Sequence, residues 1–406
     1  MKKACFQTFG CKVNQYDTQI IKERYKLFGY DTSVPVENAD VIVVNSCTVT
    51  AEADRQCRQF LRKAVKKNAS AEVIVTGCYA ERGKDELTGI SPRIKIFPDR
   101  DSIIPGDDSS PGEEARPFGI SDFDGHTRAF VKIQDGCDAF CSYCIVPYVR
   151  PGIYSRPENE VITEIKGLIN KGVPEIVLAG IRLGKYEGGL VNILKKIISH
   201  KGSFRIRLSS LEAGEIQGDL IRLIRDFPEK ICSHLHIPLQ SASDKVLSAM
   251  NRPYKSAEFA GTIDMVRKLL PEAGITTDVI VGFPGETDSD YRESEDFIKR
   301  NEFSRLHVFP YSPRPGTAAK RLGGRVDKAV IKKRSAGFRA LDAELQKAFW
   351  KKLIGTERYV VREGKSDTLL TDNYVKLKAE PARGRVMGVF KAIVYELDGE
   401  PWGRQG

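Results

Sequence analysis

The sequence predicts an α/β protein with an N-terminal parallel-sheet α/β domain, a central partial (β/α)6 barrel and a small C-terminal antiparallel β-barrel. Three observations lead to this fold class. Apolar, β-branched segments alternate with amphipathic helical segments over residues 1–100, and the alternation resumes over residues 126–317. After residue 356 the pattern changes to short alternating strands. A chain of 406 residues is long enough for two or three such domains.

The first domain, residues 1–105, is predicted to follow a β-α-β-α-β order. Strands are expected at Ala4–Phe9, Val41–Val44 and Glu72–Thr76, and helices at Gln15–Phe28 and Ala51–Lys67. This order implies a parallel sheet, because a helix crosses over between consecutive strands.

A cysteine stands just after each of these three strands: Cys11, Cys47 and Cys78. Open parallel sheets bind ligands outside the carboxyl ends of their strands. We therefore expect the three thiols to converge on one edge of the sheet, although they are far apart in the sequence. The alternative is three unrelated half-buried cysteines, which is a common fate of this residue.

Residues 106–125 lie in a stretch rich in Asp, Ser, Pro and Gly and are predicted to form a linker. The six βα units of residues 126–317 predict an open barrel with its functional loops after the strands. The expected strands are Phe130–Ile133, Glu175–Ala179, Phe204–Leu208, His234–Pro238, Thr276–Val281 and Arg305–Phe309. The expected helices are Glu158–Lys171, Leu190–Ser199, Ile216–Arg225, Ser256–Leu270 and Asp288–Arg300.

The loop after the first barrel strand carries Cys137, Cys141 and Cys144 in a C-x3-C-x2-C spacing. Thiolates are soft ligands suited to zinc or to iron–sulfur clusters. A closed site needs a fourth ligand, but the next cysteine is Cys232 and the next histidine is His200. Three cysteines can hold three irons of a 4Fe–4S cube and leave the fourth iron open. The alternative is a zinc knuckle with a distant fourth ligand.

Other loops after the barrel strands carry residues suited to a small polar ligand. Ordinary capping or loop hydrogen bonding is an equally good explanation for a single residue of this kind. The candidates are Gly180, Ser209, Glu212, Gln240, Ser241 and the turn from Gly282 to Thr287. The histidines of the apolar strands are predicted to pack in the core: His234, His236 and His307.

Positive charge is concentrated in residues 318–355, a predicted helical connector with eleven basic and three acidic residues. A solvated helix face and a contact with a nucleic-acid backbone explain such a run about equally well. The whole chain has a formal net charge of +10, which favours a polyanionic partner. Residues 356–406 are predicted to form a β-barrel of about five strands. Two of those strands are expected at Arg385–Phe390 and Ala392–Tyr395.

The location predicted from the sequence is cytoplasmic. No apolar run approaches the length of a membrane span, and the segment after Met1 is too short for a signal peptide, so no membrane partner is expected. Nine cysteines in a reducing compartment favour metal or redox chemistry over disulfides.

Taken together, these motifs resemble the methylthiotransferases of the radical S-adenosylmethionine (SAM) superfamily. The resemblance covers essentially the whole chain and identifies the last domain as TRAM-like. The Gly-Cys-Lys-Val-Asn form of the first cysteine motif resembles the branch that acts on threonylcarbamoyladenosine in tRNA, the MtaB type. The resemblance to the family as a whole rests on Thr8–Asn14, Asn45–Thr50, Thr76–Ala80, Gly136–Pro147, His236–Ser241, Asp278–Thr287 and His307–Ser312.

The resemblance implies two 4Fe–4S clusters and SAM as cofactors. Cys137, Cys141 and Cys144 would hold the cluster that cleaves SAM to a 5′-deoxyadenosyl radical. Cys11, Cys47 and Cys78 would hold the cluster that carries the sulfur for C2 of the adenine. The implied partners are tRNA, a sulfur source and an electron donor such as flavodoxin or ferredoxin. Such chemistry belongs to the cofactors, while the protein supplies position and exclusion of water.

One departure from the family pattern lies after Tyr148-Val149-Arg150, where Pro151 replaces the usual Gly. Arg150 itself remains a candidate for contact with SAM or the substrate. Two kinds of alternative stay open. A methylthiotransferase could act instead on isopentenyladenosine in tRNA or on a ribosomal-protein aspartate. A nucleic-acid-binding protein could use the same cysteines for structural metal sites.

Overall fold

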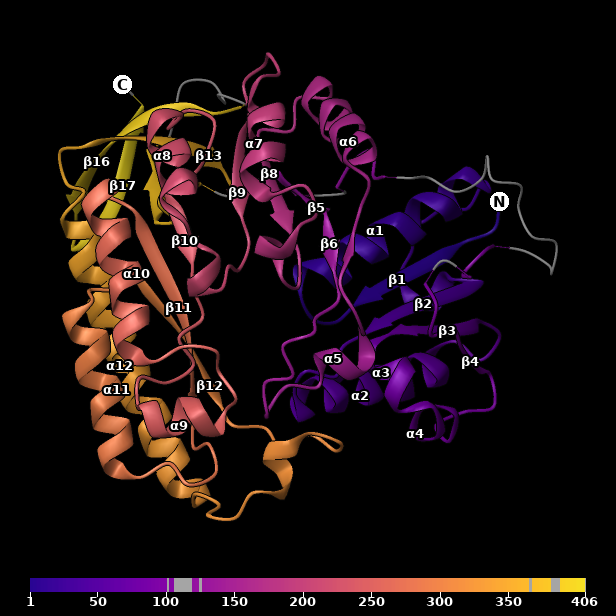
Figure 1. Ribbon diagram of the computed structural model, residues 1–406. Helices are drawn as coiled ribbons and strands as arrows, with labels where there is room; N and C mark the ends of the chain where they lie inside the picture. Colours follow the sequence, from indigo (N-terminus) through magenta and orange to yellow (C-terminus); the bar gives the residue numbers. More distant parts are fainter. Residues whose placement is uncertain (101, 106–118, 124–125, 365–366, 381–387, 406) are drawn as a thin grey trace.

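The computed structural model describes residues 1–100, 102–105, 119–123, 126–364, 367–380 and 388–405. Its three parts are the indigo N-terminal sheet, the magenta-to-orange central barrel and the yellow C-terminal barrel of Figure 1. Most of the predicted linker, residues 106–118 and 124–125, lies outside the described residues. No helix in the described part of the chain is long and apolar enough to cross a membrane.

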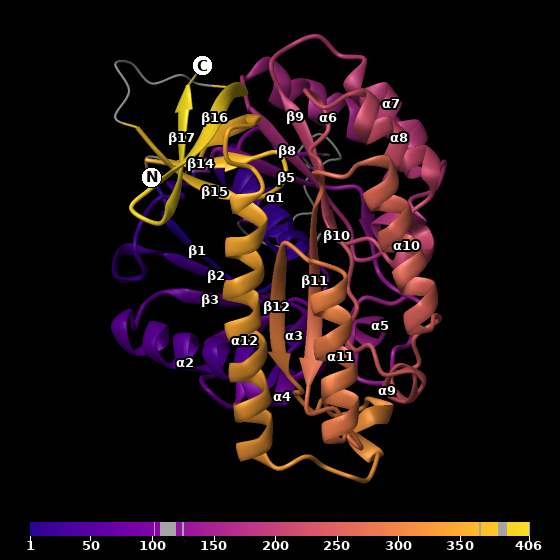
Figure 2. The same cartoon turned by 90° about the vertical axis from the view of Figure 1, so that its left-hand side faces the viewer.

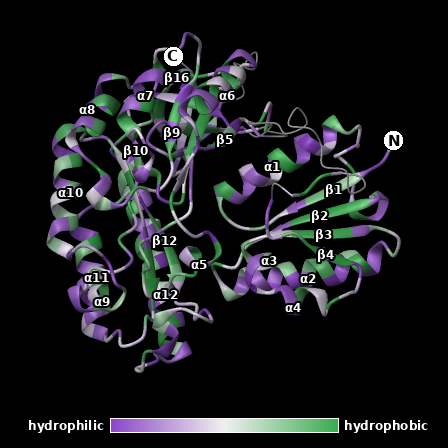
Figure 3. Ribbon diagram, turned by 45° about the vertical axis from the view of Figure 1, so that its right-hand side comes forward, coloured by the Kyte–Doolittle hydropathy of each residue, from purple (hydrophilic) through white to green (hydrophobic). Residues whose placement is uncertain are grey.

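The N-terminal sheet has four parallel strands in sequence order: β1 (Ala4–Thr8), β2 (Val41–Ser46), β3 (Glu72–Gly77) and β4 (Ile94–Ile96). Because its strands are buried, each face needs a helical cover. Helix α1 (Lys12–Leu27) covers one face, and α2 (Ala51–Lys67), α3 (Cys78–Arg82) and α4 (Lys84–Thr88) cover the other (Figure 3). The predicted parallel sheet is confirmed; β4, α3 and α4 were not foreseen.

The central barrel has six parallel strands. They are β5 (Arg128–Lys132), β8 (Glu175–Ala179), β9 (Arg205–Leu208), β10 (His234–His236), β11 (Gly274–Val281) and β12 (Arg305–Pro310). They form two three-stranded sheets, β5-β8-β9 and β10-β11-β12. Single bridges between Ile206 and Ile231 and between Ser210 and His236 join the two sheets. The predicted partial barrel is confirmed.

The helices of the barrel lie on the outer side of these strands (Figures 1 and 3). They are α6 (Glu158–Asn170), α7 (Leu190–Ile198), α8 (Gly218–Asp226), α10 (Ser256–Leu269) and α11 (Asp288–Arg300). The cysteine loop contains elements that the hydrophobic pattern did not reveal. These are the two-stranded pair β6 (Gln134–Asp135) and β7 (Tyr154–Ser155) and the short helix α5 (Val146–Val149). A further short helix, α9 (Asp244–Ala249), follows β10.

The C-terminal strands close into a five-stranded barrel in the order β13-β14-β15-β17-β16. They are β13 (Glu357–Arg362), β14 (Thr368–Thr371), β15 (Lys376–Ala379), β16 (Phe390–Leu397) and β17 (Glu400–Gln405). The predicted barrel is confirmed with two differences. The pair β15–β17 is parallel. The strand expected at Ala392–Tyr395 is part of β16, which begins at Phe390. Of the strand expected at Arg385–Phe390, residues 385–387 lie outside the described residues.

The C-terminal barrel docks on two buried arginines of β9. Arg205 donates to the backbone carbonyls of Tyr359 and Leu370, each at 2.8 Å. Arg207 donates to the carbonyls of Asp372 and Thr371, each at 2.9 Å. Both guanidinium groups pair with the fully buried carboxylate of Glu175 on β8. This arrangement fixes the C-terminal barrel on the strands of the central barrel.

The basic segment forms helix α12 (Lys328–Lys351), which lies beside β12 (Figure 2). The backbone N–H of Leu306 donates to Asp342 on α12 at 2.7 Å, so the helix satisfies part of the open strand edge. Phe338 and Leu341 are buried in the core, whereas Lys332, Lys333 and other basic residues of α12 are exposed.

Candidate active site

The first three cysteines meet at one edge of the N-terminal sheet. In the sheet, Thr8 is paired with Asn45, and Ser46 with Gly77, so the three strands end level with one another. Cys47 and Cys78 directly follow β2 and β3, and Cys11 begins the turn into α1. Burial and the nearby thiols Cys78 and Cys11 raise the pKa of Cys47 to about 12. The three side chains therefore form one electrostatically coupled group.

Two glycines make this convergence possible. Gly10 has a φ of +103°, and a Cβ there would lie 2.9 Å from the Sγ of Cys47. Gly77 has a φ of +92°, and a Cβ there would lie 2.4 Å from the carbonyl oxygen of Ser46. Only glycine fits both the backbone conformation and the space.

The second three cysteines line the loop that follows β5 and β6. The backbone N–H groups of Ala139 and Val146 each donate to a cysteine sulfur, Cys137 and Cys144, at 3.4 Å. Arg252, a residue of the loop after α9, donates to the Sγ of Cys141 at 3.3 Å. Donors of this kind stabilise thiolates and cluster ligands.

The two cysteine groups face each other across two short helices. Helix α3 begins at Cys78, and helix α5 begins two residues after Cys144. These helices are in contact, and Cys78 packs against Ile145 and Val149. Parts of the chain that are far apart in sequence thus form a single site.

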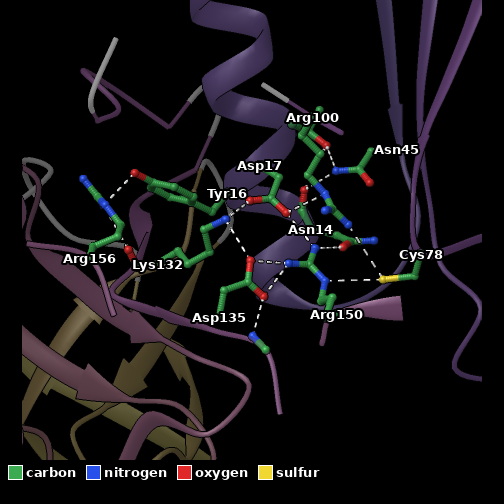
Figure 4. Close-up of polar contacts among 12 residues, drawn as sticks. Asn14, Tyr16, Asp17, Asn45, Cys78, Arg100, Lys132, Asp135, Arg150 and Arg156 are labelled. Carbon is green, nitrogen blue, oxygen red and sulfur yellow. Dashed lines mark hydrogen bonds and ion pairs between the residues drawn. The ribbon is translucent and has the colours of Figure 1, made fainter. Parts of the chain in front are cut away.

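Arg150 connects the two groups through polar contacts (Figure 4). Its Nε donates to the Sγ of Cys78 at 3.4 Å, and its Nη1 pairs with Asp135, just before the second cysteine group. Its Nη2 donates to Asn14 and Asp17 of α1, each at 2.7 Å. Lys132 and Arg100 also pair with Asp17, at 2.5 and 3.0 Å. This buried network fixes the N-terminal domain on the barrel.

Neither group of thiols has the compact arrangement of a single-zinc site. A tetrahedral zinc about 2.3 Å from each sulfur would hold the sulfurs about 3.8 Å apart. Among the described residues, we find one set of three potential metal ligands whose ligand atoms all lie within 4.8 Å of one another. It consists of His236, Asp278 and His307 and contains no cysteine. Neither cysteine group is that compact, whereas a cube binds its three thiolates through three different irons. The residues present therefore fit a 4Fe–4S cluster at each position.

The predicted ligand-contact residues lie on the loops after the barrel strands. Ser209 accepts a hydrogen bond from the Gly180 N–H at 3.3 Å, and Glu212 accepts one from Arg252. Gln240 has a φ of +66° and bridges to β11 through its backbone. The hydroxyl of Ser241 lies 3.3 Å from that of Ser294 on α11. Arg150, the sixth candidate, contacts Cys78, Asp135 and the α1 residues Asn14 and Asp17, and none of the other five candidates.

The prediction for the three strand histidines is right for one and wrong for two. His234 is buried, with its ring stacked 4.4 Å from that of Tyr374. His236 and His307 are partly exposed and both pair with Asp278 at 3.2 Å. Apolar neighbours in a strand say little about a residue's own face, because side chains alternate between faces.

Sequence reasoning also missed the charged partners Asp17, Arg100, Asp135 and Arg252. Their only signal was proximity to motifs: Asp135 lies two residues before Cys137, and Asp17 six residues after Cys11. Three cysteines belong to neither group: Cys57 and Cys232 are buried and Cys5 is half-buried, as expected of small apolar residues.

Comparison with known families agrees with this division of the chain. The family model described as "Uncharacterized protein family UPF0004" matches residues 3–98. The model of the radical SAM superfamily matches residues 131–298, which include the second cysteine group.

Full-length relatives are also similar. "Threonylcarbamoyladenosine tRNA methylthiotransferase MtaB" of Bacillus subtilis is 38% identical, over 93% of this chain and 90% of the relative. The protein of the same name from Thermotoga maritima is 36% identical, over 89% and 87%. "tRNA-2-methylthio-N(6)-dimethylallyladenosine synthase" of Syntrophus aciditrophicus is 32% identical, over 95% and 87%.

A solved structure shares the fold. The radical SAM methyltransferase TsrM from Kitasatospora setae, with cobalamin and a [4Fe–4S] cluster bound, superposes with a TM-score of 0.54 over 77% of each chain. At 12% sequence identity this likeness concerns the fold alone.

The partial barrel and its three-cysteine loop therefore define a radical SAM enzyme. Within that class, the chain belongs to the methylthiotransferase family, and relatives of the MtaB type match it at 35–38% identity over most of its length. The alternative of a binding protein with purely structural metal sites is wrong, since this family consists of transferases.

Proposed function

We propose that this enzyme adds a methylthio group to C2 of threonylcarbamoyladenosine next to the anticodon of tRNA, with two 4Fe–4S clusters and SAM. The observation that carries the proposal is the pair of three-cysteine groups packed against each other through α3 and α5. Relatives whose names give this substrate support the choice of nucleoside.

In this proposal, Cys137, Cys141 and Cys144 hold the cluster that binds SAM, and Cys11, Cys47 and Cys78 hold the auxiliary cluster. When bound, the clusters and SAM supply a carbon radical able to attack an inert aromatic C–H bond and a sulfur to replace that hydrogen. The chain contributes position: Arg150 and Arg252 donate to sulfurs of the two groups. Gly180, Ser209, Glu212, Gln240 and Ser241 are the candidate contacts for SAM on the barrel loops.

The proposed tRNA surface combines α12 with the C-terminal barrel. A crevice of about 520 Å³ lies between them, bordered by basic and aromatic side chains that include Arg305, Lys347, Trp350, Tyr374 and Lys376. Lys and Arg side chains neutralise phosphates, and aromatic rings stack on bases. An electron donor such as flavodoxin or ferredoxin and a sulfur source complete the proposed reaction.

Mass spectrometry of nucleosides tests the proposal. Anaerobically reconstituted, reduced enzyme is incubated with SAM, a sulfur source and tRNA lacking methylthio groups, and the tRNA is then digested. The expected product is methylthio-threonylcarbamoyladenosine, and a Cys141→Ala variant run in parallel should give neither this product nor 5′-deoxyadenosine.

Other outcomes would revise the proposal in defined ways. A methylthio-dimethylallyladenosine product would keep the chemistry and change the substrate. SAM cleavage without any modified nucleoside would direct the search to a ribosomal-protein aspartate. Continued 5′-deoxyadenosine formation by the Cys141→Ala variant would contradict the assignment of the SAM-binding loop.

A further inference from the structure

The inward face of β12 presents a row of side chains that the cysteine chemistry does not use. Leu306 is buried in the core between the barrel and its helices. Because strand side chains alternate, Arg305, His307 and Phe309 share the opposite face, toward the barrel interior. All three are at least partly exposed, and 43% of Phe309 is accessible.

His307 is held in one orientation by a chain of hydrogen bonds across three strands. Its Nδ1 lies 3.2 Å from Oδ1 of Asp278 on β11, and Nε2 of His236 on β10 lies 3.2 Å from the same oxygen. The other nitrogen of His236 lies 2.9 Å from the hydroxyl of Thr276. The rings of His236 and His307 stack with 5.2 Å between their centres.

Asp278 is the anchor of this chain. Burial alone would raise the pKa of Asp278, but the hydrogen bonds from His236 and His307 outweigh it and lower the pKa below its usual range. The carboxylate therefore only accepts, so Nδ1 of His307 carries its hydrogen and donates. Nε2 of His307 has no hydrogen-bond partner among the described residues, and 38% of this side chain is accessible.

We propose that His307, oriented by Asp278 and His236, reads the polar substituent on N6 of the substrate adenosine, a threonylcarbamoyl group or another substituent with hydrogen-bonding oxygens and nitrogens. This inference rests on the function proposed above. Nε2 accepts from a carbamoyl N–H when the ring is neutral and donates to a carbonyl or carboxylate oxygen when the ring is protonated. Phe309, about 6.6 Å further along the strand, offers a face on which the base can stack.

The same wall would disfavour a purely hydrocarbon substituent. A dimethylallyl group would offer no polar partner to Nε2 of the half-buried His307, and sites built to hydrogen-bond a substrate reject analogues that lack the bonding group. The polar interior therefore distinguishes between the substrates that the names of the relatives give.

Binding of short RNA tests this inference without relying on turnover. Fluorescence anisotropy would compare two anticodon stem-loops, one with threonylcarbamoyladenosine and one with unmodified adenosine, against the reconstituted enzyme. We expect the wild type to prefer the modified stem-loop by about tenfold, the size of one hydrogen bond to a charged group. His307→Leu should bring the ratio near one while binding of the unmodified stem-loop is retained.

Two further variants complete the design. Asp278→Asn should also reduce the preference for the modified stem-loop, because the acceptor that orients His307 is altered. His200 is a half-exposed histidine that follows α7, and His200→Leu should preserve the preference. Equal binding of both stem-loops by the wild type, or an unchanged preference in His307→Leu, would overturn the inference. If the enzyme still methylthiolated threonylcarbamoyladenosine in either case, the proposed function would be retained and only the role of His307 would be rejected. Failure of the inference can therefore be distinguished from failure of the proposed function.

Discussion

Arg150 donates its Nε–H to the Sγ of Cys78 at 3.4 Å, although the two residues belong to different cysteine motifs and are 72 positions apart. The same guanidinium pairs with Asp17 and Asp135 and is almost completely buried. One side chain therefore joins the edge of the N-terminal sheet to the loop of the barrel.

The first prediction concerns the redox properties of the auxiliary cluster. Hydrogen bonds and positive charge near the sulfurs favour the reduced state. Arg150→Gln should therefore lower the midpoint potential of the cluster on Cys11, Cys47 and Cys78. A tenfold change in the reduced-to-oxidised ratio corresponds to about 59 mV for one electron. Redox titration followed by electron paramagnetic resonance measures it.

Arg252→Gln is the reciprocal control, because Arg252 contacts Cys141 instead. It should lower the potential of the SAM-binding cluster and leave the auxiliary one unchanged. Equal shifts of both clusters in both variants would show a general change in the fold, and the specific role of Arg150 would be refuted.

The second prediction concerns metal content. Wild-type enzyme reconstituted under anaerobic conditions should contain about eight irons per chain, four for each 4Fe–4S cluster. A variant with Ala at Cys11, Cys47 and Cys78 should contain about four and still cleave SAM. Iron and zinc analysis together with 5′-deoxyadenosine formation checks both statements. Stoichiometric zinc in place of iron would contradict the two-cluster proposal.

The third prediction concerns pH. Burial raises the pKa of Asp17, but the opposing effects of Lys132, Arg150 and Arg100 are larger, so its pKa in the folded state is lowered. An Asp that is lowered on folding contributes stability above its unfolded pKa of about 3.9 and loses that contribution as the pH falls below it. Asp17→Asn should remove this acid-dependent part of the stability.

At neutral pH the same change should destabilise the protein by about 3 kcal/mol, because three cations lose a buried partner. Denaturation curves at pH 7 and at about pH 2.5, well below the unfolded pKa, would measure both effects. If the free energy of unfolding changed between the two pH values by the same amount in Asp17→Asn as in the wild type, Asp17 would not be the source of this acid-dependent stability.

The sequence predicted the longer strands and helices of the first two domains to within a few residues, because their hydrophobic periods are regular, but it missed the short elements such as β4, α3 and α5. The convergence of Cys11, Cys47 and Cys78 was also predictable, since parallel strands end at the same edge. The contacts of the buried charged residues could not be predicted from the sequence. Asp17 lies within a predicted helix and Arg150 follows an apolar run, but neither pattern indicates a partner for the charge, and only the docking of two domains brings the two residues together.

The C-terminal barrel was harder to predict than the rest. Its strands are short, and β17 (Glu400–Gln405) contains Pro401 and Gly403, which are both unfavourable in strands. Its position beside β15 depends on closure of the barrel, which leaves no edge unpaired. Local pattern contains no information on that pairing.

The fourth prediction concerns the docking of this barrel. Glu175→Gln removes the carboxylate that pairs with Arg205 and Arg207, both buried. Loss of one partner from a buried ion pair costs about 3–5 kcal/mol. We expect lower stability and faster proteolytic release of the C-terminal barrel. Glu187→Gln, at an exposed position, should change stability by less than about 0.5 kcal/mol.

The fifth prediction concerns the basic face of α12. Lys332, Lys333, Arg339 and Lys347 are exposed on this helix, and Lys347 also borders the crevice beside the C-terminal barrel. If this face contacts the tRNA backbone, each replaced cation removes one counterion-releasing contact. The quadruple Ala variant should bind tRNA more weakly, and the slope of log K against log salt should become shallower by roughly 0.7–0.9 per lost contact.

Lys299 supplies the matched control, since it is an exposed lysine paired with Glu295 on α11, at 2.7 Å. Lys299→Ala should leave both the affinity and the salt slope unchanged. A quadruple variant with weaker binding but an unchanged slope would indicate a local change in helix structure. An unchanged affinity would assign α12 a purely solvated face, because phosphate contacts contribute to affinity for every tRNA sequence alike.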